Sequence, residues 1–219
     1  MKRASPIFSV NPIFFEAALL FLAGGFAFLL FSSRASGFIH LNFYHSEWLD
    51  KFFIYYTNFG DGLFSILVVL LLLLFRRFKL AWQVLLSYIV SGLFTQFLKA
   101  IIYSPRPKDF FRLREHIHLI DGVTLNGNGS FPSGHAASAF ALATSLALFT
   151  KNKQLSLLYL GAAILVGYSR IYLAQHFPAD VMGGAIIGIV MAILVYYLTQ
   201  RFQTRSNPLK RSGLTKTSR

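Results

Sequence analysis

The side chains best suited to chemistry lie between two apolar runs, in the stretch from Ser169 to Asp180. This stretch places Arg170, His176 and Asp180 at the edge of a membrane segment, where polar groups are costly and tend to mark function. Histidine is a competent nucleophile when a neighbour fixes its tautomer, and an aspartate does so by accepting the Nδ1 proton. We therefore expect His176 to attack phosphorus, with Asp180 orienting it and Arg170 holding the phosphate. Taken alone, the histidine and aspartate also fit a structural hydrogen bond or a pair of metal ligands.

Two further clusters supply the groups that such chemistry needs. The first contributes the cations Lys99 and Arg106, and the planar fork of arginine suits phosphate oxygens. The second is Ser133, Gly134 and His135 at the expected start of a helix, where free N–H groups and the helix dipole favour an anion. His135 can donate a proton to a leaving alkoxide as general acid. Positioning and charge neutralisation are the requirements of phosphoryl transfer, so the three clusters together predict a phosphoryl-transfer site.

The composition places this site in a membrane protein. Hydrophobic residues make up 55% of the 219-residue chain and charged residues 13%, whereas soluble domains carry about a quarter charged residues. The absence of cysteine excludes disulfides and thiolate metal sites. The net charge of +13 sits in short loops and a tail between apolar runs, which is typical of membrane topology. We therefore expect a lipid bilayer and no nucleic acid as partner.

Six apolar runs predict an all-α fold, a polytopic bundle of six transmembrane helices. The first run is longer than the about 7–15 apolar residues of a signal peptide, which favours a retained helix over a cleaved leader. Between spans one and two, residues 32–61 mix aromatic and charged side chains and predict an interfacial amphipathic helix. We expect residues 1–200 to form one membrane domain and residues 201–219 a disordered basic tail. The six expected spans are Pro12–Phe31, Leu63–Phe75, Leu80–Tyr103, Ser133–Phe149, Leu155–Leu173 and Ala179–Leu198.

The distribution of charge predicts the orientation in the membrane. With six spans, both termini share a side with the basic turns after spans two and four, and this side carries most of the lysines and arginines. The positive-inside rule makes that side cytoplasmic. All three clusters then lie on the opposite side, facing the periplasm or cell exterior. The short loops favour a bacterial inner membrane.

The motifs resemble a known family. Lys-x6-Arg-Pro from Lys99, Pro-Ser-Gly-His ending at His135, and Ser-Arg-x5-His-x3-Asp ending at Asp180 are similar to the three-part signature of the type 2 phosphatidic acid phosphatase (PAP2) superfamily. The resemblance implies a six-span lipid phosphatase with its site near the outer surface. It also implies that His135 is the acid/base, that His176 is the nucleophile, and that no metal or other cofactor is required.

The resemblance leaves the substrate open. A lipid phosphate or diphosphate is expected, such as phosphatidylglycerol phosphate, phosphatidate, undecaprenyl diphosphate or a phosphate of lipid A. A lipid phosphotransferase with the same phosphohistidine intermediate is the alternative, and acceptor-dependent release of phosphate separates the two. Arg112, Arg114 and His118 are candidates for binding the lipid headgroup, although surface positions are the more usual interpretation of such loop residues. The sequence does not determine the oligomeric state.

Overall fold

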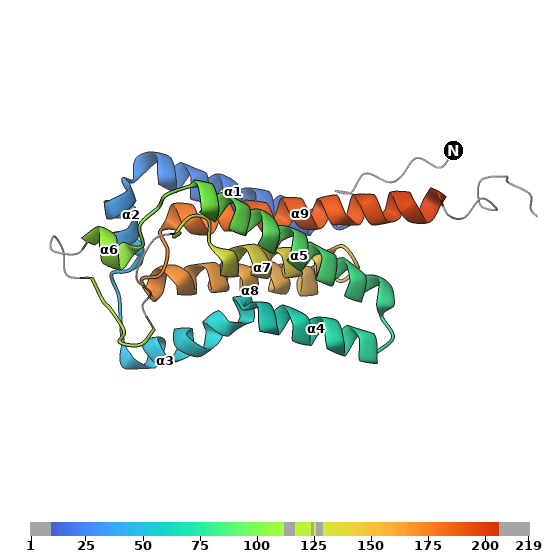
Figure 1. Cartoon of the computed structure of the whole chain (residues 1–219), viewed down its shortest axis with the longest axis horizontal. Helices are drawn as coiled ribbons and strands as arrows, with labels where there is room; N and C mark the ends of the chain where they lie inside the picture. Colours follow the sequence, from blue (N-terminus) through green and yellow to red (C-terminus); the bar gives the residue numbers. More distant parts are fainter. Residues whose placement is uncertain (1–9, 112–116, 124, 126–128, 206–219) are drawn as a thin grey trace, which may run out of the picture.

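The computed structural model describes residues 10–111, 117–123, 125 and 129–205, and within this part of the chain the regular elements are helices without any strand (Figure 1). The predicted all-α fold is therefore confirmed. Four helices are long and apolar enough to cross a membrane, α1 (Pro12–Phe31), α5 (Phe78–Ile101), α8 (Lys153–Tyr172) and α9 (Pro178–Arg205). The shorter elements are α2 (Arg34–Leu41), α3 (Glu47–Tyr56), the 3-10 helix η2 (Thr57–Gly60), α4 (Gly62–Leu74), α6 (Pro107–Phe111) and α7 (Gly134–Ala147).

Two of the six predicted spans are shorter than a bilayer requires. The 13 residues of α4 and the 14 of α7 correspond to about 20 Å each at about 1.5 Å per residue, against a hydrocarbon core of about 30 Å. The segment from α3 through η2 and α4 are together long and apolar enough to form one broken span, with a bend of 58° between them. The described residues thus contain four candidate spans, or five with this bent pair, and the count of six stays a prediction.

The segment predicted as one interfacial helix contains two helices and η2. Ser33 caps α2 in a reciprocal capping box with Ser36, and the side chain of Ser46 accepts a hydrogen bond from the Leu49 amide at the start of α3. Each serine hydroxyl satisfies an amide that a helix start leaves free, so the chain begins a new helix at each serine. The interfacial location of this segment stays a prediction.

The alanine-rich helix α7 lies at the centre of the bundle and packs against α5, α8 and α9 (Figure 1). Two glycines of α9 allow the closest approach. A Cβ atom at Gly184 would lie 2.4 Å from the Ser133 carbonyl oxygen, and one at Gly188 would lie 2.4 Å from the Ala137 carbonyl oxygen. Small residues let helix backbones touch in this way in membrane proteins. The contact brings the start of α7 against the first turns of α9.

The elements that carry the three motifs meet at one end of the bundle. Figure 1 shows the end of α5, the start of α7, the end of α8 and the start of α9 at the end where α2 and α6 also lie. The turns from α4 to α5 and from α7 to α8 lie at the opposite end. Helix α9 continues to Arg205, five residues into the predicted tail. The rest of that tail, like Arg112 and Arg114, lies outside the described residues.

The contact between α7 and α9 predicts a stability difference between two glycine substitutions. Gly184→Ala pushes a methyl group into a backbone oxygen, so we expect it to lower the free energy of unfolding by about 1–3 kcal/mol. Gly161→Ala in α8 is the matched control, because a Cβ atom there meets nothing within 4 Å. It should be neutral or stabilise by up to about 1 kcal/mol through helix propensity. Thermal unfolding in detergent measures both, and equal stability of the two variants would contradict the close contact.

Candidate active site

A tight turn between α8 and α9 holds His176. The amides of Gln175 and His176 both donate to the carbonyl oxygen of Arg170, at 2.9 and 3.1 Å, and Ala174 takes a positive φ of 51° to close the turn. Pro178 then begins α9, as its fixed φ suits a first helical position. The imidazole of His176 is only 3% exposed. The local fold therefore presents one buried histidine between two long helices.

Asp180 lies one helical turn beyond His176 and faces it. Its Oδ2 is 3.7 Å from Nδ1 of His176, longer than a hydrogen bond, and that nitrogen has no hydrogen-bond partner among the described residues. The same Oδ2 accepts hydrogen bonds from the Ser130 hydroxyl and, at 2.8 Å, from the Phe177 amide. Catalytic hydrogen bonds are often long before substrate binds. The aspartate is thus fixed in the position from which it can orient the imidazole.

The surroundings of His176 keep its ring neutral. The pKa of His176 is lowered from the ordinary 6.5 to about 4, chiefly by burial and in part by the positive charges of Arg170 and Arg106, while Asp180 opposes the shift. At neutral pH the ring therefore carries a free lone pair. If Nδ1 carries the proton toward Asp180, that lone pair is on Nε2. A neutral imidazole of this tautomer is the form in which histidine acts as a nucleophile.

Three cations belong to the cluster of His135, His176 and Asp180, and each is anchored through one hydrogen-bond partner. Arg170 is 4% exposed and donates to the Thr57 hydroxyl at 2.6 Å, while its buried Nε has no partner among the described residues. Arg106 donates to the Gln175 carbonyl oxygen at 3.0 Å, and its burial lowers the pKa of the guanidinium. Lys99 donates to the Gly129 carbonyl oxygen. Their remaining N–H donors suit the oxygens of a phosphate.

The start of α7 forms the other wall of the site. Ser133 is fully buried and caps the helix by accepting from the Ala136 amide at 3.4 Å. A Cβ atom at Gly134 would meet nothing within 4 Å, so space is open beside the first turn, where helix amides favour anions. His135 is 28% exposed, with Nε2 4.0 Å from Oδ2 of Asp61. The charges of Lys99, Arg106, Arg170 and His176 all act on the ring of His135, so every predicted site residue belongs to one cluster.

Several residues that position this cluster were not predicted. The Ser130 hydroxyl holds Asp180, and the Ser130 amide donates to the Ser104 carbonyl oxygen at 2.9 Å. Arg34 donates to the Ser104 hydroxyl at 2.9 Å, and its guanidinium lies 4.0 Å from the centre of the Phe177 ring. Asp61 is the carboxylate beside His135. Nothing in the sequence distinguishes Arg34 from any other basic residue that follows a span. Ser130 lies in a turn like other serines, and only its position just before the second motif could have indicated its role.

One candidate headgroup residue lies elsewhere. His118 pairs with Asp50, at 3.0 Å between Nε2 and Oδ2. The two other candidates, Arg112 and Arg114, lie outside the described residues. The role of all three in binding a headgroup stays a prediction.

Comparison with known proteins identifies the family. A family model described as the PAP2 superfamily matches residues 80–204, which contain all three motifs. The chain belongs to the PAP2 superfamily. The family match and the relatives, which are named as phosphatases, together confirm the predicted class, a PAP2-type phosphatase of the membrane.

These PAP2 relatives cover most of the chain. The undecaprenyl-diphosphatase BcrC of Bacillus subtilis is 27% identical over 72% of this chain and 79% of the relative. Phosphatidylglycerophosphatase B of the same organism is 32% identical over 68% of this chain and 74% of the relative. The crystal structure of Aquifex aeolicus LpxE matches with a TM-score of 0.66 at 31% identity, over 73% of this chain and 92% of that one.

Proposed function

We propose that the protein hydrolyses a lipid phosphate or diphosphate monoester through a phosphohistidine on His176. The observation that carries the proposal is the buried, neutral His176, which lies opposite Asp180 and is acted on by the charges of Arg106 and Arg170, in one cluster with His135 and Lys99. A site for binding an anion alone needs the cations but neither a nucleophile nor an acid. The cations, the nucleophile and the acid lie in one cluster, which favours an enzyme over a protein that only binds or transports an anion.

Binding is the first step of the proposed reaction. The three cations neutralise charge on the phosphate oxygens, and the arginines do so with donors arranged in a fork. The first turn of α7 offers its amides beside the open space at Gly134. These donors are already held by Thr57, Gln175 and the turn before α7, so they need little rearrangement as charge develops.

Two chemical steps follow. The lone pair on Nε2 of His176 forms a bond to phosphorus while the bond from phosphorus to the leaving oxygen breaks. His135, protonated when the negative charge of the bound phosphate offsets the three cations, gives its proton to that oxygen. The lipid alcohol departs, or the lipid monophosphate when the substrate is a diphosphate. Neutral His135 then takes a proton from water as the water oxygen attacks phosphorus. The bond from phosphorus to nitrogen breaks, and inorganic phosphate and neutral His176 are restored.

An apolar pocket beside the site suits the lipid tail. The pocket has a volume of about 200 Å³ and lies between α1, α2, α8 and α9. It reaches Pro178, two residues from His176, so a tail lying in it would leave the phosphate at the turn. Relatives named for undecaprenyl diphosphate and for phosphatidylglycerophosphate support a lipid substrate of this kind. The lining residues are Phe21, Gly25, Phe28, Leu41, Ile164, Tyr168, Ile171, Pro178, Val181 and Met182.

We also propose that the site faces the periplasm of a bacterial inner membrane and that both termini are cytoplasmic. In this arrangement α7 and the bent pair of α3 and α4 complete six crossings. The supporting observation is that the basic turn of Arg76, Arg77 and Lys79 lies at the end of the bundle opposite the motifs (Figure 1). Lysine and arginine are enriched in cytoplasmic turns.

Substitution of His176 tests the proposed activity. We expect purified wild-type protein to release phosphate from at least one of four lipids, namely phosphatidylglycerol phosphate, phosphatidate, undecaprenyl diphosphate and lipid A. His135→Ala should lower kcat by about 10²–10⁴-fold, as for loss of a general acid, and His176→Ala should lower it further. His40→Ala is the matched control, because His40 is exposed on α2 and bonds only to the Ser36 carbonyl oxygen in the described structure. Turnover retained by a folded His176→Ala variant would refute the nucleophile.

Single cysteines test the orientation, because the chain has none of its own. Leu125→Cys lies in the segment that joins α6 to α7, Lys151→Cys lies in the turn between α7 and α8, and both positions are exposed. An impermeant maleimide should label Leu125→Cys in intact cells and Lys151→Cys only after lysis. The reverse pattern would place the site on the cytoplasmic side.

A further inference from the structure

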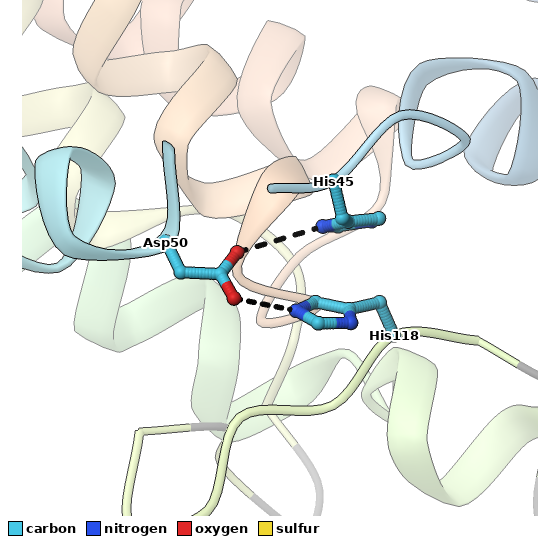
Figure 2. Close-up of side chains that lie close together, drawn as sticks. All are labelled: His45, Asp50 and His118. Atoms are coloured by element: carbon cyan, nitrogen blue, oxygen red, sulfur yellow. Dashed lines mark hydrogen bonds and ion pairs between the residues drawn. The ribbon is translucent and has the colours of Figure 1, made fainter. Parts of the chain in front are cut away.

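A cluster of two histidines and an aspartate lies apart from the site described above. His45 comes from the loop between α2 and α3, Asp50 from α3, and His118 from the segment 117–123 (Figure 2). Figure 2 shows one carboxylate oxygen directed at each imidazole, at 3.9 Å from Nδ1 of His45 and 3.0 Å from Nε2 of His118. The three potential ligand atoms lie within 4.8 Å of one another. The two rings stack with centroids 3.9 Å apart.

The hydrogen bonds of His45 leave a lone pair pointing at the carboxylate. Its Nε2 lies 2.7 Å from the Asn42 carbonyl oxygen, and a carbonyl only accepts, so Nε2 carries the proton. Nδ1 is buried and has no hydrogen-bond partner among the described residues. It faces an Asp50 oxygen that is itself an acceptor, at 3.9 Å. Two acceptors that face each other across 3.9 Å are best satisfied by a cation.

Hydrogen bonds from behind hold His45 and Asp50 in place, as is usual for the side chains that bind a metal. Metal-binding histidines almost always donate their other N–H to a carbonyl or carboxylate, as His45 does to Asn42. The Asn42 side chain is fixed in turn by bonds of 2.9 Å to the carbonyl oxygens of Ile171 and Tyr172. The Tyr172 hydroxyl donates to Oδ1 of Asp50 at 2.6 Å. Tyr172 and the two carbonyl groups that hold Asn42 belong to the end of α8, so the cluster is supported by a long helix.

We propose that His45, Asp50 and His118 bind one divalent transition cation with the ligand preference of Zn²⁺. Two imidazole nitrogens and one carboxylate oxygen suit this class, whereas Ca²⁺ and Mg²⁺ prefer oxygen ligands. Tetrahedral bonds of about 2.0–2.1 Å place ligand atoms about 3.3 Å apart. The three potential ligand atoms lie within 4.8 Å of one another, and the carboxylate approaches His45 through Oδ1 at 3.9 Å and His118 through Oδ2 at 3.0 Å, so small side-chain rotations bring them to that spacing. Water takes the fourth position. The cation replaces the Nε2 proton of His118, whose ring stays neutral with its proton on Nδ1.

The position of the site gives the cation a structural role. It joins the loop before α3, α3 itself and the segment that carries His118. That segment is also tied to the His176 turn, because the Gln175 side chain donates to the Val123 carbonyl oxygen at 2.8 Å. A bound cation therefore clamps the segment 117–123 against the end of α8. It takes no part in the bond changes at His176, so protein stripped of metal should keep its phosphatase chemistry.

Zinc binding to full-length, tag-free protein tests this site. After EDTA treatment and its removal, wild-type protein in detergent should bind one equivalent of Zn²⁺ by titration calorimetry. Saturating Zn²⁺ should raise the melting temperature by about 5–10 °C, as expected for a ligand at about 100 times its Kd. Failure of the stripped wild-type protein to bind one equivalent would overturn the proposal.

Matched variants locate the binding. Asp50→Asn and His118→Gln should each weaken binding by more than about 100-fold, beyond the about 10–100-fold typical of outer-shell changes. Tyr172→Phe, which removes only the hydroxyl behind Asp50, should weaken it by about tenfold. The side chain of His118 is 34% exposed, so we expect the His118→Gln variant to fold. It therefore tests the site even if the Asp50→Asn variant does not fold. The exposed His40→Gln should bind as wild type does. Unchanged affinity of the His118→Gln variant would assign the zinc to another place and refute the site.

Discussion

The backbone contact between α7 and α9 is the constraint on which the active site depends. The Ser133 amide donates to the Asp180 carbonyl oxygen at 2.9 Å, and Gly184 has no side chain to separate the two helices there. This contact joins the second motif to the third, because His135 and His176 each lie within a few residues of it. The proposed acid and nucleophile therefore face one another only while the two helix starts stay in contact.

The same packing concentrates positive charge where water is scarce. Arg170 is buried and Arg106 is half-buried, with Lys99 nearby, and burial of like charges is unfavourable unless partners compensate. Asp180 and backbone carbonyl oxygens offset part of this cost, while buried Arg170 keeps a donor without a partner among the described residues. The phosphate dianion of the proposed substrate would supply the missing charge. The arrangement therefore favours bound phosphate, and its donors are already oriented for the charge that develops in the transition state.

The sequence predicted the elements that follow from local patterns. Long apolar runs predicted the bounds of α1, α5 and α8 and the start of α9 to within about two residues, whereas α9 continues beyond the predicted end at Leu198 to Arg205. The motif spacing pointed to the residues of the cluster from Lys99 to Asp180. It did not predict residues whose role arises from contacts distant in the chain, such as Ser130 with Asp180 or Arg34 with Ser104. The cluster of His45, Asp50 and His118 was not predicted for the same reason, since its three residues come from segments that only folding brings together. The lengths of α4 and α7 also depend on packing, which apolar runs do not encode.

Direct detection of the covalent intermediate tests the central claim. The His135→Asn variant should accumulate the intermediate with a phosphate ester whose leaving group needs no proton, because the base that activates water is absent. Rapid quenching at alkaline pH, where phosphohistidine survives, followed by peptide mass spectrometry should find one phosphoryl group on His176. Covalent phosphate on another side chain, or turnover without covalent phosphate, would contradict the account.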